Sequence, residues 1–227
     1  QKVNKNIVLV VMSGRPLDLS WEDQNIPAIV QAWHLGSKSG DAIAQVLYGD
    51  YNPSGKLTMS FPRNVGQVPV YYNFKNTGRP STSIEQVTNS GYADVENSPL
   101  YSFGYGLSYT EFKYSDFEIS SSNMTKDSKI NASIRVTNTG KFKGEEVVQL
   151  YLRDIVGSIA RPMKELKGFE KIELNPGESK IVNFEIENSL LEFYSYNNIW
   201  ESEPGKFHVF IGTDSNVKDY KEFYLTD

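Results

Sequence analysis

The sequence contains no cysteine among its 227 residues. The chain therefore forms no disulfide, carries no thiolate nucleophile and has no zinc–sulfur ligand set, and this fits the cytoplasm and the periplasm equally. Histidine is almost as scarce, because His34 and His208 are the only two. Neither lies in a nucleophile-elbow motif, so we expect no catalytic role for them. We predict a structural or subsite role for His34, after a helix end, and a solvent-facing position within a strand for His208.

Clusters of basic residues and long apolar runs are also absent. The formal net charge is −5, which argues against a nucleic-acid partner. No apolar run reaches the roughly 20 residues that a membrane-spanning helix needs. The first apolar run, residues 7–12, is too short for a signal peptide, although a natural N-terminus farther upstream would make this uninformative. The turn at residues 50–55 lacks the ligand series of a calcium loop, so we expect no metal and no cofactor.

The first hundred residues show an α/β pattern. Residues 7–12 form a continuous apolar run rich in β-branched residues, as in a parallel strand covered by helices. Apolar residues at helical spacing predict a helix over residues 26–33, preceded by the acidic residues Glu22 and Asp23, and a second helix over 42–47.

A strand and a long irregular segment follow this α/β pattern. Leu57, Met59 and Phe61 alternate as in a strand that Pro62 ends. Residues 64–105 are rich in proline, glycine, tyrosine and asparagine, and so long a loop is usually functional or packed on a neighbour. One parallel strand, two helices and a terminal strand cannot cover both faces of a doubly wound sheet, so we expect the α/β domain to begin upstream of Gln1.

The pattern changes to all-β from about residue 112. About seven strands separated by turns predict an immunoglobulin-like or fibronectin type III-like sandwich, and the missing cysteine pair excludes a true antibody domain. We therefore predict an α/β part with a long loop or linker at residues 1–111 and a sandwich domain at residues 112–227. The predicted strands lie around residues 117–119, 130–136, 147–152, 166–174, 181–186, 207–211 and 223–225.

Several ordered blocks resemble glycoside hydrolase family 3. The strongest is VLYGDYNPSGKL at residues 46–57, which runs on to SFPR at 60–63. Residues 10–17, 32–44 and 101–110 match other family blocks in the same order, and segments near 136–140, 161–169 and 203–207 resemble the family's fibronectin type III-like domain. The resemblance covers nearly the whole chain, and its nearest likeness is to periplasmic β-glucosidases.

This resemblance implies an exo-acting, retaining β-glucosidase that is periplasmic or secreted. In the family the active site lies between an N-terminal (β/α)8 barrel and the α/β sandwich domain. The barrel supplies the nucleophilic Asp. In many members the acid/base Glu lies in the α/β sandwich domain, before the strand that opens this chain. A retaining enzyme needs both carboxylates, about 5 to 5.5 Å apart. Neither motif occurs here, so we assign no catalytic residue and predict an inactive segment. The implied partners are the barrel and a β-glucoside oligosaccharide or an aryl or plant glycoside, with a β-xyloside as the alternative substrate.

The candidate substrate-binding residues are Arg15, Trp33, His34 and Lys38. Arg15 follows a predicted parallel strand, and residues at such strand ends line crevices in open α/β sheets. Lys38 stands where relatives commonly have Glu; the change alters leaving-group preference if the loop faces the aglycone and is neutral if it only packs. The alternative readings are a core position for Trp33 and an interdomain salt bridge for Arg15.

A noncatalytic function is the other alternative, with the sandwich as a carbohydrate-binding module or a structural brace. We expect no sugar binding by the sandwich, because the sequence shows no evident cluster of aromatics on one face. Neighbouring acidic residues point apart on helices and strands, so three acidic pairs are predicted to be solvated surface charge. These pairs are Glu22/Asp23, Glu145/Glu146 and Glu201/Glu203.

Overall fold

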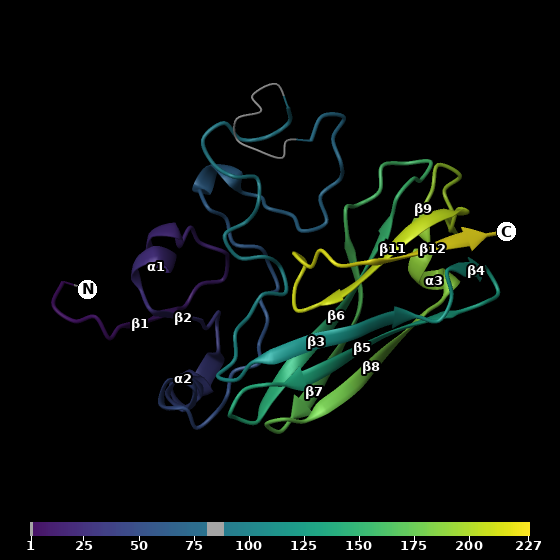
Figure 1. The fold of residues 1–227 in the computed structure, drawn as a ribbon. Coiled ribbons are helices and arrows are strands. Elements are labelled where there is room, and N and C mark those ends of the chain that lie inside the picture. The colour runs from purple at the N-terminus through teal and green to yellow at the C-terminus, as the bar shows by residue number, and fades with distance from the viewer. Residues whose placement is uncertain (1, 81–88) are drawn as a thin grey trace.

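The computed structural model describes residues 2–80 and 89–227, and Figure 1 shows an N-terminal α/β part beside a β-sandwich. In the first part, β1 (Val8–Val11) and β2 (Ala28–Gln31) form a parallel two-stranded sheet. The helices α1 (Ser20–Asn25) and α2 (Ser39–Tyr48) lie on opposite sides of this pair in the view of Figure 1. The expected combination of α/β and all-β architecture is confirmed.

Helix α2 confirms the second predicted helix. It ends at Tyr48 because Gly49 adopts a left-handed conformation, with φ of 82°, and its N–H binds the carbonyl of Val46 at 3.2 Å. Glycine reaches this conformation without steric cost, which makes it the usual residue just past a helix end. A short 3-10 helix, η1 (Gly36–Lys38), leads directly into α2.

The predicted helix over residues 26–33 is wrong, because this segment holds strand β2. Helix α1 stops at Asn25, and Ile26 is extended, with φ −108° and ψ 122°. Pro27 explains the change, since a residue before proline is driven out of the helical region. Ile29 and Val30 are β-branched and favour the strand that pairs with β1.

The predicted strand over residues 57–61 is also wrong as a regular element. Leu57 and Phe61 each exchange backbone hydrogen bonds with the segment 100–105, but the residues between them do not continue the ladder. Only an isolated bridge between Phe61 and Tyr101 remains. Phe61 is nonetheless buried, in a small apolar cluster with Val11 and Leu19.

The long segment from residue 64 to 105 is irregular over its described residues, apart from the 3-10 turn η2 (Val65–Gln67). Residues 81–88 of this segment lie outside the described residues. Part of the segment packs on the sandwich, because Tyr72 stacks on Phe103 at 4.2 Å and meets Tyr151 of the sandwich edge-on at 6.1 Å. The Tyr72 hydroxyl also accepts a hydrogen bond from the Leu166 N–H at 3.2 Å.

The sandwich consists of two packed sheets. A three-stranded sheet has the order β3-β5-β8 and a five-stranded sheet has the order β4-β12-β11-β6-β7. All neighbours are antiparallel except β12 and β4. The strands are β3 (Phe112–Ile119), β4 (Asn123–Thr125), β5 (Ile130–Asn138), β6 (Gly144–Asp154), β7 (Glu165–Leu174), β8 (Ser179–Ile186), β11 (Gly205–Gly212) and β12 (Lys221–Thr226).

A short helix and a small hairpin complete the sandwich. Helix α3 (Asn188–Leu191) precedes β9 (Phe193–Tyr194), which pairs with β10 (Trp200–Glu201). The seven predicted strands are present, and the sequence reading missed β4, β9 and β10, which are too short to show alternation. Across the described ranges, the structure has no helix long and apolar enough to cross a bilayer.

Alternation along the strands builds the core between the two sheets. In β5, Ile130, Ala132, Ile134 and Val136 all point inward and are buried. The same period of two operates on the other strands, because successive side chains of a strand point to opposite faces. One continuous cluster of buried apolar residues therefore fills the sandwich.

Candidate functional site

Three of the four predicted site residues lie at the carboxyl ends of the two parallel strands. Arg15 belongs to the turn after β1, whereas Trp33 and His34 directly follow β2. The Ala32 N–H donates to the Val11 carbonyl at 2.8 Å, which keeps the segments that follow β1 and β2 side by side. His34 therefore follows a strand, and the expectation of a helix end before it is wrong.

A tight turn brings His34 against Gly14. A Cβ atom at position 14 would lie 2.9 Å from Nε2 of His34, so a larger residue would displace the imidazole. The Ser13 hydroxyl stabilises the turn, since it donates to the Arg15 carbonyl at 2.8 Å and accepts from the Arg15 N–H at 3.3 Å. Arg15 is exposed and, in the described part of the chain, forms no salt bridge.

Trp33 has a packing role in addition to its place at the strand end. Its ring meets the buried ring of Phe61 edge-on, with centroids 6.0 Å apart, and it packs against the same cluster as Leu9 and Ile29. Its φ of 49° is unusual for a large side chain and costs about 1 to 3 kcal/mol. The core reading of Trp33 is therefore supported by its contacts.

Lys38 stands apart from the other three candidates. Its side chain is 87% exposed and binds Asp41, in the first turn of α2, at 3.2 Å. This pair is a surface ion pair, and such pairs typically contribute little to stability. Within the described residues, the structure joins Lys38 to its own helix and not to Arg15 or His34.

The sequence reading missed a buried charge cluster between the two parts of the chain. Lys56 of the α/β part lies 3.2 Å from Glu146 of β6, and their side chains are only 11% and 4% exposed. Tyr114 of β3 donates its hydroxyl to the same carboxylate at 2.9 Å, and Lys56 also donates to the Gly106 carbonyl at 2.9 Å. We call Lys56, Glu146 and Tyr114 the seam cluster.

Burial dominates the electrostatics of the seam cluster. It raises the pKa of the Glu146 carboxyl, while Lys56 and the Tyr114 hydroxyl pull that pKa down. Burial and the neighbouring Glu146 charge both raise the pKa of Tyr114, so the phenol stays protonated and donates its proton to the carboxylate. The prediction that Glu146 is solvated is wrong. Its inward position follows the period of two that also buries Val148 and Leu150, so the signal was present in the sequence.

The neutral side chain of Asn52 adds further hydrogen bonds between the two parts of the chain. The Asn52 carbonyl oxygen accepts from the Ser108 hydroxyl at 2.8 Å and the Tyr109 N–H at 2.7 Å. Its amide nitrogen donates to the Lys143 carbonyl in the sandwich at 2.9 Å. One asparagine of the turn at residues 52–55 thus binds both the linker and the sandwich.

The acidic residues of α1 also have a partner. The Tyr101 hydroxyl donates to Asp23 at 2.6 Å, and the Tyr101 ring stacks on Tyr105 at 5.4 Å. Burial raises the pKa of Tyr101, and the hydrogen bond to Asp23 raises it further. Asp23 is exposed, as predicted for a surface charge, but its hydrogen bond also anchors the segment 101–105 to α1.

Comparison with known proteins assigns a family to the two parts of the chain. Residues 1–109 match the glycosyl hydrolase family 3 C-terminal domain, and residues 146–215 match a fibronectin type III-like domain. A periplasmic β-glucosidase of Salmonella typhimurium is 55% identical over 212 residues, which are 93% of this chain and 28% of that protein. The chain belongs to the C-terminal portion of glycosyl hydrolase family 3.

Other family 3 relatives include enzymes named for a different sugar. A β-xylosidase of Formosa agariphila is 41% identical over 229 residues, which are 99% of this chain and 30% of that protein. Among solved structures, a Listeria innocua β-glucosidase in complex with glucose has a TM-score of 0.92 at 39% identity, covering 100% of this chain and 32% of that one. The chain spans less than a third of the length of each of these relatives.

Proposed function

We propose that the chain is the C-terminal part of a longer, retaining, exo-acting β-glycoside hydrolase that removes terminal non-reducing β-D-glucosyl residues. The observation that carries this proposal is the 55% identity, across 93% of the chain, to a periplasmic β-glucosidase. The same relative supports a periplasmic or secreted location. The β-xylosidase at 41% identity supports a β-xyloside as the second substrate.

The reacting carboxylates in this proposal lie in the remainder of the enzyme, with the nucleophile on an N-terminal barrel. A retaining mechanism needs a nucleophile and an acid/base about 5 to 5.5 Å apart, and the product keeps the anomeric configuration of the substrate. The present chain contributes the strand ends around Gly14 and His34. We propose that Arg15, Trp33, His34 and Lys38 line the aglycone side of the shared site, with Trp33 also holding the turn on its core.

The sandwich has a bracing role in this proposal, and its boundary lies at residues 111 and 112. The buried seam cluster supports this, since Glu146 and Tyr114 belong to the sandwich and Lys56 to the α/β part. A purely structural or sugar-binding chain without any link to catalysis is the alternative. A fragment of residues 112–227 that unfolds cooperatively in urea supports the boundary, and an unfolded fragment contradicts it.

The test is hydrolysis by the intact enzyme. We expect release of p-nitrophenol from the aryl β-D-glucoside at a higher kcat/KM than from the matching β-D-xyloside. Proton NMR of the first product should show the β-anomer before mutarotation. A higher kcat/KM for the xyloside would make the β-xyloside the main substrate and the β-glucoside the second. An initial α-anomer, or no hydrolysis of either glycoside, contradicts the proposal.

A further inference from the structure

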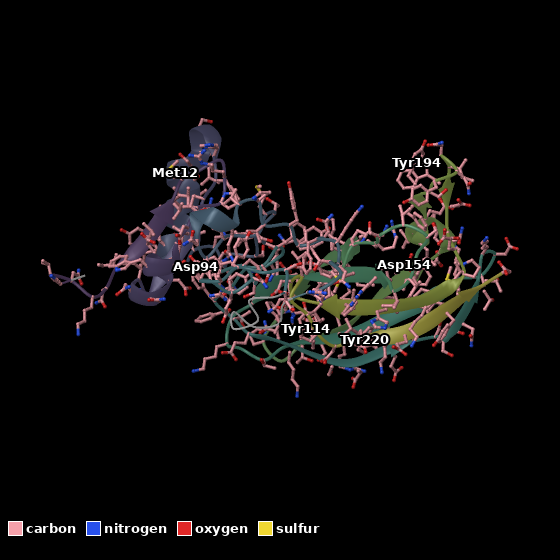
Figure 2. All side chains as sticks on the ribbon, turned by 90° about the horizontal axis from the view of Figure 1, so that it is seen from above. Met12, Asp94, Tyr114, Asp154, Tyr194 and Tyr220 are labelled. Carbon is pink, nitrogen blue, oxygen red and sulfur yellow. The ribbon has the colours of Figure 1, made fainter. Side chains whose placement is uncertain are left out.

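A small hairpin at the end of the sandwich carries a group of exposed aromatic side chains. We call residues 193–201, which comprise β9, β10 and the loop between them, the aromatic hairpin. Figure 2 shows Tyr194 at the end of the molecule opposite Met12, on a segment that stands out from the sheets. The hairpin is therefore remote from the strand ends of the α/β part.

Three aromatic side chains of this hairpin are largely exposed to solvent in spite of their size. Tyr194 is 51% exposed, Tyr196 80% and Trp200 68%. Tyr194 and Trp200 are direct cross-strand partners, and their ring centroids lie 5.9 Å apart at an interplanar angle of 65°. The expectation that the sandwich has no cluster of aromatics on one face is wrong here. Grouped exposed rings of this kind usually mark a binding surface.

Several contacts hold the hairpin in place beneath these rings. Phe193 is buried below the hairpin, and the Arg161 guanidinium lies 4.2 Å from its ring centroid. Across the turn, the Ser195 N–H donates to the Ile199 carbonyl at 3.0 Å. The Ser195 hydroxyl and the Asn197 amide both donate to Glu201. A platform fixed in advance loses little conformational entropy when a ligand binds.

The charge of the hairpin narrows the choice of ligand. Glu201 is the only ionisable acid or base with a full charge at neutral pH between residues 193 and 201, and Ser195 and Asn197 already bind its carboxylate. The hairpin therefore presents rings, hydroxyls and amides without a free cation, which does not suit an anionic membrane or nucleic acid. An uncharged ligand with many hydroxyls and apolar C–H faces complements it, because an aromatic face is the negative side of the ring quadrupole.

We propose that the aromatic hairpin is a carbohydrate-binding site that holds a soluble, uncharged β-glucan chain by stacking sugar rings on Tyr194 and Trp200. The planes of the two rings are inclined at 65°, so both cannot lie flat on the planar surface of a crystalline glucan. A single soluble chain fits this geometry. The choice of a β-glucan rests on the proposed function. A glycan held at the far end of the sandwich would raise the local substrate concentration for the enzyme.

Calorimetric titration of the 227-residue chain with cellohexaose and with laminarihexaose tests this site. We expect saturable binding of at least one of them. Trp200→Ala should weaken that binding about fivefold, since one lost stacking contact is worth about 1 kcal/mol. The matched control is Phe169→Ala, which removes a 67% exposed ring from β7 and should leave the affinity unchanged. Trp200→Tyr keeps an aromatic face and should retain most of the affinity.

Three results would overturn the inference. The first is no binding of either hexasaccharide by the folded chain, and the second is equal binding by Trp200→Ala and wild type. The third is self-association in sedimentation velocity that Trp200→Ala abolishes, because it would identify the hairpin as a contact between copies. If the intact enzyme hydrolyses glycosides but the 227-residue chain binds no glucan, only this inference is contradicted. If the chain binds glucan but the intact enzyme hydrolyses no glycoside, only the proposed function is contradicted.

Discussion

Lys56 is a lysine in a largely buried position, with a side chain only 11% exposed. Its ammonium group is enclosed at the seam by the Glu146 carboxylate and the Gly106 carbonyl. A buried pair contributes little net stability compared with an apolar pair, but removal of one member leaves an uncompensated charge in a poorly solvated place. The seam therefore depends on both members being present.

We expect Lys56→Met to destabilise the chain by about 3 kcal/mol at neutral pH, because Glu146 then remains buried without a cation. Urea unfolding followed by circular dichroism measures the loss. The matched control is Lys171→Met. Lys171 is about half exposed and lies 2.7 Å from Glu145, which is on the same strand as Glu146. That variant should lose less than about 1 kcal/mol. Equal losses in the two variants would contradict the buried role of Lys56.

The pH dependence of the Lys56→Met defect has a definite sign. Burial already raises the pKa of Glu146 above its ordinary 4.5, and loss of Lys56 raises it further. Between 4.5 and the raised value the folded chain holds a proton that the unfolded chain releases, so stability increases as pH falls through this window. The gap to wild type should therefore narrow on acidification. A gap that widens towards pH 5 would contradict this assignment.

A substitution at Lys38 tests the proposal that this residue lines the aglycone side of the shared site. We expect Lys38→Glu in the intact enzyme to change the ratio of kcat/KM for an anionic and a neutral aryl aglycone, with unchanged thermal stability, because the side chain is exposed. Lys180→Glu, on the sandwich and paired with Glu170, is the charge-matched control and should leave the ratio unchanged. An unaltered ratio in Lys38→Glu would support the packing-only alternative.

At the scale of elements, the segment 101–106 joins the two parts through Gly104. Gly104 has φ of 83°, and its carbonyl accepts from the Gln149 amide at 3.1 Å. A Cβ atom at this position would overlap the Gln149 side chain, which is buried and also accepts from the Tyr151 hydroxyl at 2.6 Å. The segment therefore requires glycine for two separate reasons.

We expect Gly104→Ala to cost about 3 kcal/mol or more, because about 1 to 2 kcal/mol of left-handed strain adds to the displacement of Gln149. Gly177→Ala is the matched control, since Gly177 has φ of 79° but open space around its Cβ position. That variant should cost only the strain, about 1 to 2 kcal/mol. Thermal unfolding of both variants measures the difference, and a smaller loss at position 104 than at 177 would contradict the overlap.

Elements with a long periodic pattern were predictable from the sequence. Helix α2 and the long sandwich strands follow their apolar spacing, and Glu146 was identifiable from the alternation of β6. Residues 26–33 were misread because Ile26, Ile29, Val30 and Trp33 fit a helical period, while Pro27 sets the backbone. The pairing of Tyr194 with Trp200 was not predictable, because it depends on a two-residue ladder that short-range patterns do not mark.

At the scale of the whole molecule, the chain combines a small parallel pair, a buried seam and a complete sandwich. The first part exposes large apolar side chains, with Met12 at 56% and Tyr48 at 85%, whereas the core of the sandwich is fully enclosed. These exposed side chains, and a length below a third of the relatives, fit the shared site in the proposed function. In the proposed function the sandwich contributes position and stability, and the proposed hairpin site binds the glycan.

Hydrolysis of p-nitrophenyl β-D-glucoside by the folded 227-residue chain alone, beside the intact enzyme at equal molar concentration, tests this division most directly. We expect the chain to release p-nitrophenol no faster than buffer, while the intact enzyme turns over, because the proposed function places the two reacting carboxylates outside these residues. Circular dichroism confirms that the sample is folded. Clear turnover by the isolated chain would contradict the assignment of catalysis to the rest of the enzyme.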